Sequence, residues 1–249
     1  MNRFSSFDGT QIAFEVLGEG EPVVMLHGFA SDSRTNFVRP GVAQAVVDSG
    51  RRVVLIDARG HGESGKPHDP AAYGKGAMVR DVQGLLDCLH IERFDLVGYS
   101  MGAFVAVKLA PLEPRLRSLV LGGVGLAQLR RPPGDAIRIA EALEAPDPAS
   151  IAAPTPRSFR NFADATHADR FALAALQRGG DFFPAEAELG LVTVPTLVLN
   201  GAKDTLAGDP APLAAAIPAG RSETVPGDHL SAVVQPEFRQ AVVRFLESV

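Results

Sequence analysis

The sequence predicts an α/β fold with a mostly parallel central sheet of about eight strands, helices on both faces, and a helical cap inserted after the sixth strand. Three observations predict it. Short continuous apolar runs such as Pro22–Leu26 are typical of strands that helices cover on both faces. These runs alternate with segments whose apolar residues recur at helical spacing. Between Gly123 and Val192 the alternation stops, because short helical segments separated by prolines follow one another without a good strand.

The N-terminal half opens with a predicted hairpin. Its strands, Arg3–Ser6 and Gln11–Val16, flank the turn signal Asp8-Gly9. The next predicted elements are a strand at Pro22–Leu26, a helix at Asn36–Ser49, a strand at Arg52–Asp57, a helix at Met78–His90, a strand at Phe94–Val97, a helix from Met101 that Pro111 and Pro114 end, and a strand at Leu116–Gly122.

The C-terminal half begins with the segment that lacks strands. Its predicted helices are Asp135–Glu144, Pro156–Ala165 and Asp169–Arg178. Alternation then resumes with a strand at Val194–Asn200, a helix at Asp209–Ile217 with Asp209 as its N-cap, a strand at Ser222–Val225, and a last helix from Pro236. We therefore expect a core made of residues 1–124 and 191–249, and a helical cap made of residues 125–190.

Composition bounds the class of protein. The 249 residues are 46% hydrophobic, and no apolar run approaches membrane-spanning length. A net charge of −5, with 24 basic and 29 acidic residues and no long charge blocks, makes neither nucleic acid nor a membrane an expected partner. The N-terminus lacks the pattern of an export signal, and a single cysteine, Cys88, excludes an intrachain disulfide, so we expect a cytoplasmic protein. The apolar run around Cys88 predicts a packed thiol.

A sharp strand-to-helix turn at Ser100 organises the chain. The motif Gly98-Tyr99-Ser100-Met101-Gly102 follows an apolar strand and precedes a helix-compatible run, which is the context that this motif needs. Glycines two residues to either side of Ser100 allow the close approach of backbone that such a turn requires. The pattern predicts an exposed serine hydroxyl beside the peptide N–H groups of a helix N-terminus, which is a nucleophile's position.

A serine nucleophile needs a histidine base and a carboxylate that orients it. The chain has His27, His61, His68, His90, His167 and His229. His229 directly follows the final strand, at the edge where parallel strands place catalytic groups, and is favoured over the other five. His27 and His61 also follow strands, among glycines in loops that they could support by hydrogen bonds.

The orienting carboxylate should follow a strand between the serine and the histidine. Asp204 leaves its strand on the correct side of the sheet. Asp209 competes, but its place before Pro210 explains it as a helix cap. Asp228 would have to turn back on its neighbour His229. We therefore expect Ser100, Asp204 and His229 to act together.

The tetrahedral intermediate of such a reaction carries a negative oxygen that peptide N–H groups stabilise. One donor is expected from Met101, directly after the serine, and the other from Phe29 in the loop that follows Leu26. Apolar residues of the cap and of the loops beside the site are candidates for the wall of the substrate pocket, although most of those in the cap could merely fasten it to the core. The candidates are Phe29, Phe159, Phe162, Phe171, Phe182, Phe183 and Leu230.

With these residues in place, the chain resembles the α/β-hydrolase superfamily along nearly its whole length, and within it the serine esterase and enol-lactonase branch. The shared motifs are HGF at 27–29, DARGHGES at 57–64, GYSMGA at 98–103, GAKD at 201–204 and GDH at 227–229. The resemblance implies a helical cap between the sixth and seventh strands, no cofactor and no metal. Some relatives hold the acid after the sixth strand, where this chain has Gly122-Gly123, which favours Asp204.

The resemblance also narrows the reaction. Dehalogenases and epoxide hydrolases of the superfamily use an aspartate where this chain has Ser100. The resemblance therefore implies a serine hydrolase that cleaves carboxylic esters of small to medium acyl length, or lactones, through an acyl-enzyme. The expected partner is a small-molecule substrate. The sequence leaves open whether the protein is a monomer or a homodimer.

Two alternatives remain. A carbon–carbon bond hydrolase or a perhydrolase would use the same three side chains, and the former would bring basic groups such as Arg34, Arg157 and Arg160 to a dicarboxylate. The absence of tryptophan speaks against the aromatic pocket wall of perhydrolases. A ligand-binding member of the fold with little turnover would keep the same site.

Overall fold

A computed structural model describes residues 1–130 and 134–249. Within these residues, eight strands form one sheet in the order β1-β2-β4-β3-β5-β6-β7-β8. The pairs β1–β2 and β2–β4 are antiparallel, and the remaining neighbours are parallel. The strands are β1 (Asn2–Ser5), β2 (Gln11–Leu17), β3 (Pro22–Leu26), β4 (Arg52–Ile56), β5 (Phe94–Tyr99), β6 (Leu116–Gly122), β7 (Thr196–Gly201) and β8 (Gly220–Val225). The predicted fold class is therefore confirmed.

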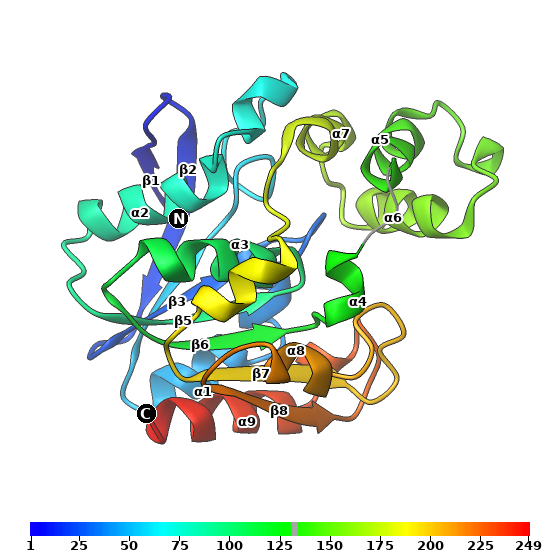
Figure 1. Ribbon diagram of the computed structural model, residues 1–249. Coiled ribbons are helices and arrows are strands. Elements are labelled where there is room, and N and C mark those ends of the chain that lie inside the picture. The colour runs from blue at the N-terminus through cyan, green and yellow to red at the C-terminus, as the bar shows by residue number, and fades with distance from the viewer. Residues whose placement is uncertain (131–133) are drawn as a thin grey trace.

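Helices cover both faces of the sheet. The α-helices are α1 (Val42–Asp48), α2 (Ala77–Cys88), α3 (Met101–Leu109), α4 (Leu126–Leu129), α5 (Asp135–Glu144), α6 (Pro154–Ala165), α7 (Arg170–Gly179), α8 (Ala211–Ala215) and α9 (Pro236–Glu247). Short 3-10 helices lie at Pro70–Tyr73, Ala110–Leu112, Pro148–Ser150, Glu186–Leu191 and Ala232–Val234. Figure 1 shows α1 and α9 below the sheet and α2 and α3 above it, and each pair packs on its own apolar cluster.

The central strands are buried along their whole length, which is why they are continuous apolar runs. Every residue of β3 and of β5 is buried. The parallel register pairs Leu26 with Gly98, Tyr99 with Gly122, and Gly201 with Val225. The carboxyl ends of these strands therefore meet at one edge of the sheet, and the loops that follow them lie next to one another.

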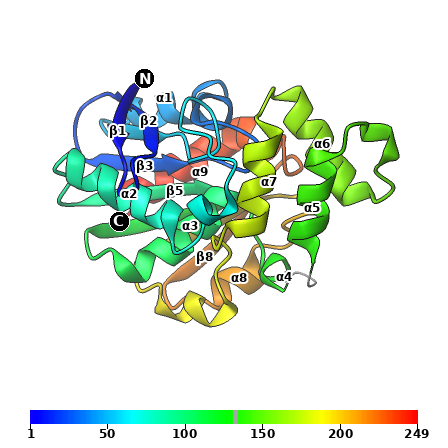
Figure 2. The same cartoon turned by 90° about the horizontal axis from the view of Figure 1, so that it is seen from above.

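Helices α4 to α7 form the segment between β6 and β7. In Figure 2, α5, α6 and α7 gather at one side of the molecule. They have a small apolar cluster of their own, to which Ala30 of the core contributes; its buried members are Ala30, Ile139, Ala140, Leu143, Ala163, Leu173 and Ala174. This helical insertion thus packs on itself and touches the core at the loop that follows β3.

The single helix predicted at Asn36–Ser49 was wrong. The structure has a π-helical turn at Arg34–Val38, a break, and then α1. Pro40 and Gly41 separate the two pieces, and Gly41 has a φ of 77° that ends one helical path and starts another. The predicted N-cap of α8 also differs, because α8 begins at Ala211, whose N–H donates to the Asp209 carboxylate.

The packed thiol predicted for Cys88 was also wrong, because Cys88 is exposed at the end of α2. The buried stripe of this helix includes Val82, Leu85 and Leu86. Cys88 is the last residue of α2 and lies beyond Leu86, the last buried residue of the helix.

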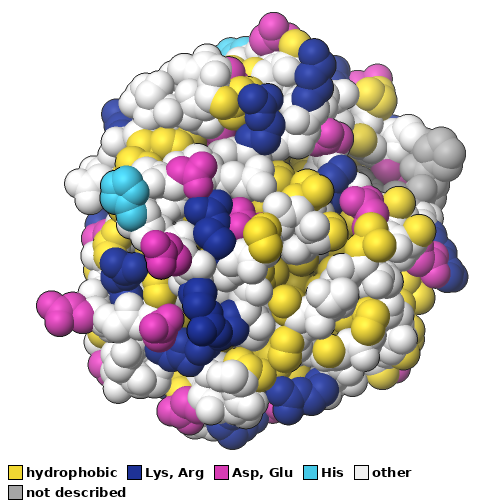
Figure 3. Space-filling model, turned by 60° about the vertical axis from the view of Figure 1, so that its left-hand side comes forward, with side chains coloured by type: hydrophobic (Ala, Val, Ile, Leu, Met, Phe, Trp, Pro, Cys, Tyr) yellow, Lys and Arg dark blue, Asp and Glu magenta, His cyan; other side chains and the backbone are white. Residues whose placement is uncertain are grey.

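The surface mixes charges of both signs. On the face shown in Figure 3, Lys and Arg side chains lie among Asp and Glu side chains, and hydrophobic side chains gather to the right of centre. None of the helices in residues 1–130 and 134–249 combines the length and the apolar character that crossing a bilayer requires.

Candidate active site

Ser100 sits on a strained turn between β5 and α3. Its φ of 51° and ψ of −113° lie in a region that residues with a side chain rarely adopt. The flanking glycines explain how the turn is tolerated. A Cβ on Gly98 would lie 2.6 Å from the Gly102 carbonyl oxygen, and a Cβ on Gly102 would overlap the carbonyl oxygen of Leu26. The two glycines thus let α3 start directly against the ends of β5 and β3.

The structure brings Ser100, His229 and Asp204 together in one hydrogen-bonded chain. His229 Nε2 lies 3.1 Å from Ser100 Oγ, and His229 Nδ1 lies 2.8 Å from the Asp204 carboxylate. In the neutral imidazole, Nδ1–H then donates to Asp204 and Nε2 accepts from the serine hydroxyl. The Asp204 side chain is fully buried, whereas that of His229 is 18% exposed. This arrangement can remove a proton from Ser100.

The loop that follows β7 holds the Asp204 carboxylate in place. Its Oδ1 accepts from the N–H groups of Leu206 and Ala207, at 3.0 and 2.9 Å, which leaves Oδ2 to His229. The buried side-chain amide of Asn200 holds the end of this loop by donating to the carbonyl oxygens of Val124 and Gly208. The position of Asp204 is therefore set by several short contacts rather than by one.

The two competing aspartates serve local turns. Asp209 accepts from the Ala211 N–H at the start of α8. Asp228 accepts from the N–H groups of Leu230 and Ser231 and from the Ser231 hydroxyl, and these bonds, first of all that from the hydroxyl, hold the pKa of Asp228 below its usual value. Neither carboxylate contacts the imidazole of His229 in the described residues.

The loop His27-Gly28-Phe29 passes directly over the serine. A Cβ on Gly28 would lie 3.4 Å from Ser100 Cβ. The Gly28 N–H donates to Asn36 in the π-helical turn at 2.8 Å, and the Gly28 carbonyl accepts from His27 Nδ1 at 2.8 Å. The backbone N–H and the backbone carbonyl of Gly28 are therefore both hydrogen-bonded. Within the described residues, the N–H groups of Phe29 and Met101 donate to no other backbone group.

The sequence predicts that His27 and His61 support the shapes of their loops by hydrogen bonds. In the structure, His61 Nδ1 bonds to the Arg59 carbonyl oxygen within the glycine-rich loop that follows β4, and His27 bonds to the same loop. His27 Nε2 accepts from the Ala58 N–H at 3.0 Å. Burial alone would raise the pKa of the Asp57 carboxyl, but the hydrogen bonds from the Ser33 hydroxyl and N–H and from the Glu63 N–H hold it below its usual value. Complete burial lowers the pKa of His61 to about 3, so this imidazole stays neutral.

The pocket candidates fall into separate groups. Phe29 contacts Phe159, with ring centroids 5.6 Å apart, and both rings adjoin the apolar cluster of the insertion, as does Phe162. Phe182 and Phe183 instead belong to the core, where Phe183 packs on Phe104 of α3 at 4.6 Å. Phe171 is half exposed beside His68, and Leu230, next to His229, is 61% exposed. Of these candidates, Phe29 and Phe159 thus form a ring contact between the insertion and the loop that passes over the serine, and Phe182 and Phe183 form one in the core.

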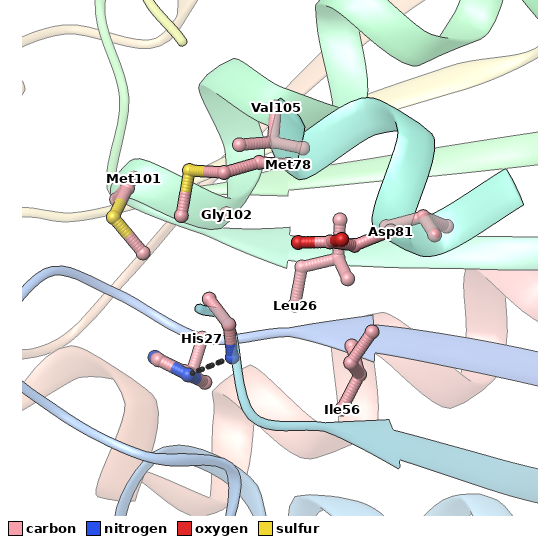
Figure 4. Close-up of a pocket in the computed structure, with 10 residues that line it drawn as sticks. Leu26, His27, Ile56, Met78, Asp81, Met101, Gly102 and Val105 are labelled. Atoms are coloured by element: carbon pink, nitrogen blue, oxygen red, sulfur yellow. Dashed lines mark hydrogen bonds between the residues drawn. The ribbon is translucent and has the colours of Figure 1, made fainter. Parts of the chain in front are cut away.

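A small cavity lies on the core side of Met101. It has a volume of about 20 Å³, room for roughly one water molecule. Its lining includes Leu26 and Ile56 of the sheet and Asp81 of α2 (Figure 4). Neither Ser100 nor His229 lines it, although His27 and Met101 do. No group of three or more His, Cys, Asp or Glu residues in the described parts of the chain could hold a metal ion.

Two residues that contact the site were not singled out from the sequence. Asn200 clamps the loop of Asp204, and Tyr99 donates its hydroxyl proton to the carbonyl oxygen of His229 at 2.7 Å. The position of Tyr99 directly before Ser100 was visible, but nothing in a sequence says where a side chain at that position points.

The chain is similar to known proteins both in sequence and in structure. The sequence model of a family described as "alpha/beta hydrolase fold" matches residues 21–189. The structure is similar to that of an enol-lactonase from Burkholderia xenovorans, with 26% identity, a TM-score of 0.81, and coverage of 99% of this chain and 100% of the other. It is also similar to a thermophilic esterase from Thermogutta terrifontis, with 27% identity, a TM-score of 0.79, and coverage of 99% and 98%.

Among curated proteins, the chain is similar to a 2-hydroxymuconate semialdehyde hydrolase from a Pseudomonas strain. The two are 39% identical over 111 residues, which is 43% of this chain and 37% of the relative. The match spans about a third of the length of the first curated relatives, 35% and 32%.

Proposed function

The chain belongs to the α/β-hydrolase fold family, and from this premise we propose that it is a serine hydrolase that cleaves carboxylic esters of small to medium acyl length, or lactones. One observation carries the proposal. The hydrogen-bonded chain from Asp204 through His229 to Ser100 is the arrangement that activates a serine hydroxyl. The likeness to an enol-lactonase and to an esterase supports an ester as the substrate.

In the first half of the proposed reaction, Ser100 Oγ attacks the ester carbonyl carbon while His229 Nε2 takes the hydroxyl proton. The carbonyl π electrons move onto oxygen, and the N–H groups of Phe29 and Met101 bind the resulting oxyanion. Each donor of this kind contributes roughly 3 kcal/mol to the transition state. The Asp204 carboxylate stabilises the imidazolium that forms. Collapse of the intermediate breaks the bond to the alcohol, which leaves with the proton from His229.

In the second half, water attacks the acyl group on Ser100 and gives a proton to His229. Collapse breaks the bond between Ser100 Oγ and the acyl carbon, the proton returns to Oγ, and the carboxylic acid leaves. A lactone passes through the same two steps, but its alcohol and its acid belong to one molecule, so the product is a hydroxy acid.

We assign the role of a cap to residues 125–190, over a core made of residues 1–124 and 191–249. Two contacts support this role. The ring of Phe159 in the insertion touches Phe29, and the Thr166 hydroxyl donates to the Ala30 carbonyl at 2.8 Å. The insertion is thus attached to the same loop that offers the Phe29 N–H to the substrate. A substrate that reaches Ser100 would pass beside this junction.

A carbon–carbon bond hydrolase remains the second candidate, because the chain is similar to a 2-hydroxymuconate semialdehyde hydrolase. The basic side chains that such a substrate would need are engaged elsewhere. Arg34 pairs with Glu15 at 3.0 Å, Arg157 donates to a backbone carbonyl at 2.6 Å, and the buried Arg160 pairs with Asp164 at 2.9 Å. These partners favour the ester over a carboxylate-bearing substrate of this kind.

A substrate panel tests the proposal. We expect the highest kcat/KM with p-nitrophenyl esters from acetyl to dodecanoyl or with simple and enol lactones, and a much lower value with 2-hydroxymuconate semialdehyde. Faster cleavage of the semialdehyde would favour the carbon–carbon hydrolase. No turnover of any of these, together with no reaction with a fluorophosphonate, would favour a ligand-binding member of the fold.

A further inference from the structure

The turn that carries His229 lies at the surface. Pro226, Asp228 and Leu230 are exposed, and Gly227 has a φ of 106°. The bonds from Leu230 and the Ser231 N–H and hydroxyl to Asp228 stay inside the turn. They give the turn its shape but do not fix where it stands relative to Ser100. An exposed turn with few buried contacts opens at a low free-energy cost.

Besides the side-chain bonds of His229 to Ser100 and Asp204, two bonds within the described residues tie the backbone of this turn to its neighbours in β5 and in the loop that follows β7. On the side of Asp204, the Lys203 N–H donates to the Gly227 carbonyl at 2.9 Å. On the side of the serine, the Tyr99 hydroxyl donates to the carbonyl of His229 itself at 2.7 Å. Tyr99 is the last residue of β5 and is directly followed by Ser100. The second bond therefore links the backbone of the base to the residue that precedes the nucleophile.

Tyr99 is well placed to hold a fixed position. It is 3% exposed, and its ring packs edge-to-face on Phe238 of α9 with centroids 5.7 Å apart. Its ring also lies 5.7 Å from that of His229. Burial, and after it the nearby carboxylate of Asp204, raises the pKa of the Tyr99 hydroxyl, so it keeps the proton that it donates.

The end of β6 makes room for this ring. A Cβ on Gly122 would lie 2.7 Å from Tyr99 Cδ2, and a Cβ on Gly123 would lie 3.0 Å from Tyr99 Cζ and 3.2 Å from His229 Cε1. Gly123 also has a φ of 65°. Because neither Gly122 nor Gly123 has a side chain, the end of β6 leaves room for the rings of Tyr99 and His229.

We propose that Tyr99 is a positioning residue, whose hydroxyl holds the His229 turn at the distance from Ser100 that proton transfer needs. This inference rests on the proposed function, because it assigns Tyr99 to the same serine mechanism. The tether acts on the backbone of His229 and leaves the imidazole free to bond Ser100 and Asp204. A base held in this way needs no rearrangement before it accepts the proton.

Tyr99→Phe tests the proposal, because it removes the hydroxyl and keeps the ring. We expect kcat for p-nitrophenyl acetate to fall about fivefold to tenfold, the effect of losing one hydrogen bond that holds the competent geometry. We expect KM to change little, because the hydroxyl touches His229 and not the substrate. Hydrogen–deuterium exchange of peptides that contain Pro226–Ser231 should become at least several times faster.

Tyr73→Phe is the matched control. Tyr73 is the other tyrosine of the chain, it is 1% exposed, and its hydroxyl donates to the Pro67 carbonyl at the same distance of 2.7 Å. Both variants lose a buried hydroxyl bonded to a backbone carbonyl, so a general loss of stability should lower their melting temperatures alike. Only Tyr99→Phe should have a lower kcat and faster hydrogen–deuterium exchange in the 226–231 turn.

The exchange measurement separates this inference from the proposed function. Unchanged exchange at residues 226–231 in folded Tyr99→Phe, or a kcat that falls no more than in Tyr73→Phe, would overturn the role of Tyr99. A wild-type protein without ester turnover would count against the proposed function instead, and faster exchange at the turn in Tyr99→Phe would then still support the tether.

Discussion

His229 Nε2 lies 3.1 Å from Ser100 Oγ, although 129 positions separate the two residues in the chain. The sheet explains this approach. Ser100 follows β5 and His229 follows β8, and β5 to β8 run parallel, so their carboxyl ends share one edge. Asp204 follows β7 between them and reaches the other nitrogen of the same ring. The contact is thus a product of the topology, and the loops only adjust it.

Ser100→Ala should abolish ester turnover and leave the fold intact. Alanine keeps the Cβ that the turn at φ 51° already accommodates, but it lacks the oxygen that attacks the substrate. Loss of a serine nucleophile costs about 10⁶-fold in kcat. Steady-state hydrolysis of p-nitrophenyl acetate and a thermal melt check both parts. Turnover near that of the wild type would remove Ser100 from the mechanism.

Asp204→Asn should lower kcat by about 10⁴-fold, because a neutral amide cannot stabilise the imidazolium and favours the wrong tautomer of His229. Asp209→Asn is the control. An asparagine there can still accept from the Ala211 N–H, which is the bond that Asp209 makes in the structure. If both variants keep full kcat with the same esters, the orienting carboxylate lies elsewhere.

Gly123→Ala should reduce kcat by about fivefold to tenfold, since a methyl group 3.2 Å from His229 Cε1 would push the ring by a few tenths of an ångström. Gly50→Ala is the control, because Gly50 has a φ of 81° and nothing within 4 Å of an added Cβ. Alanine at a positive φ costs roughly 1–2 kcal/mol, so chemical denaturation should show this loss of stability in both variants, and a larger one in Gly123→Ala, whose methyl group also meets Tyr99. Equal kcat in both would contradict the crowding of His229.

The free energy of unfolding should fall as the pH drops from 7 to 5, in part because of His61. Burial lowers its pKa from 6.5 to about 3, so the unfolded chain takes up a proton below pH 6.5 and the folded chain does not until about pH 3. The stability that depends on neutral His61 is complete above pH 6.5 and is lost progressively toward pH 3. We expect the contribution of His61 to lower the free energy of unfolding by about 2 kcal/mol between pH 7 and pH 5.

Urea titrations of the wild type and of His61→Gln at both pH values measure this contribution. The glutamine variant should show a pH dependence that is shallower by about 2 kcal/mol, because it has no proton to take up at this position. Parallel curves for the two proteins would show that His61 does not contribute.

Much of the fold could be predicted because its signals are local. The bounds of β3, β6 and α5 match the apolar runs and the helical spacing that predicted them. The failures lie where tertiary contacts decide. The π-helical turn before α1 places the Asn36 side chain where it accepts from the Gly28 N–H, eight residues earlier in the chain. Hydrophobic periodicity carries no information about such a contact. The exposure of Cys88 depends on the rotation of α2 against the sheet.

The site divides in the same way. Ser100, His229 and Asp204 could be proposed from their places after strands, because parallel topology brings such positions together. The pocket candidates could not be sorted, since Phe159 and Phe182 are both aromatic residues of the same inserted segment but pack against the insertion and the core respectively. Tyr99 bonds to the His229 carbonyl and Asn200 to the Val124 carbonyl; both partners are distant in sequence, and no sequence pattern encodes them.

Mass spectrometry of the native protein after reaction with a fluorophosphonate tests most directly whether Ser100 is an activated nucleophile. We predict one covalent adduct, located on Ser100 by peptide fragmentation, that forms rapidly in the wild type and at least a hundredfold more slowly in His229→Ala. A folded wild-type protein that stays unlabelled, or that carries its adduct on a different residue, would contradict the account.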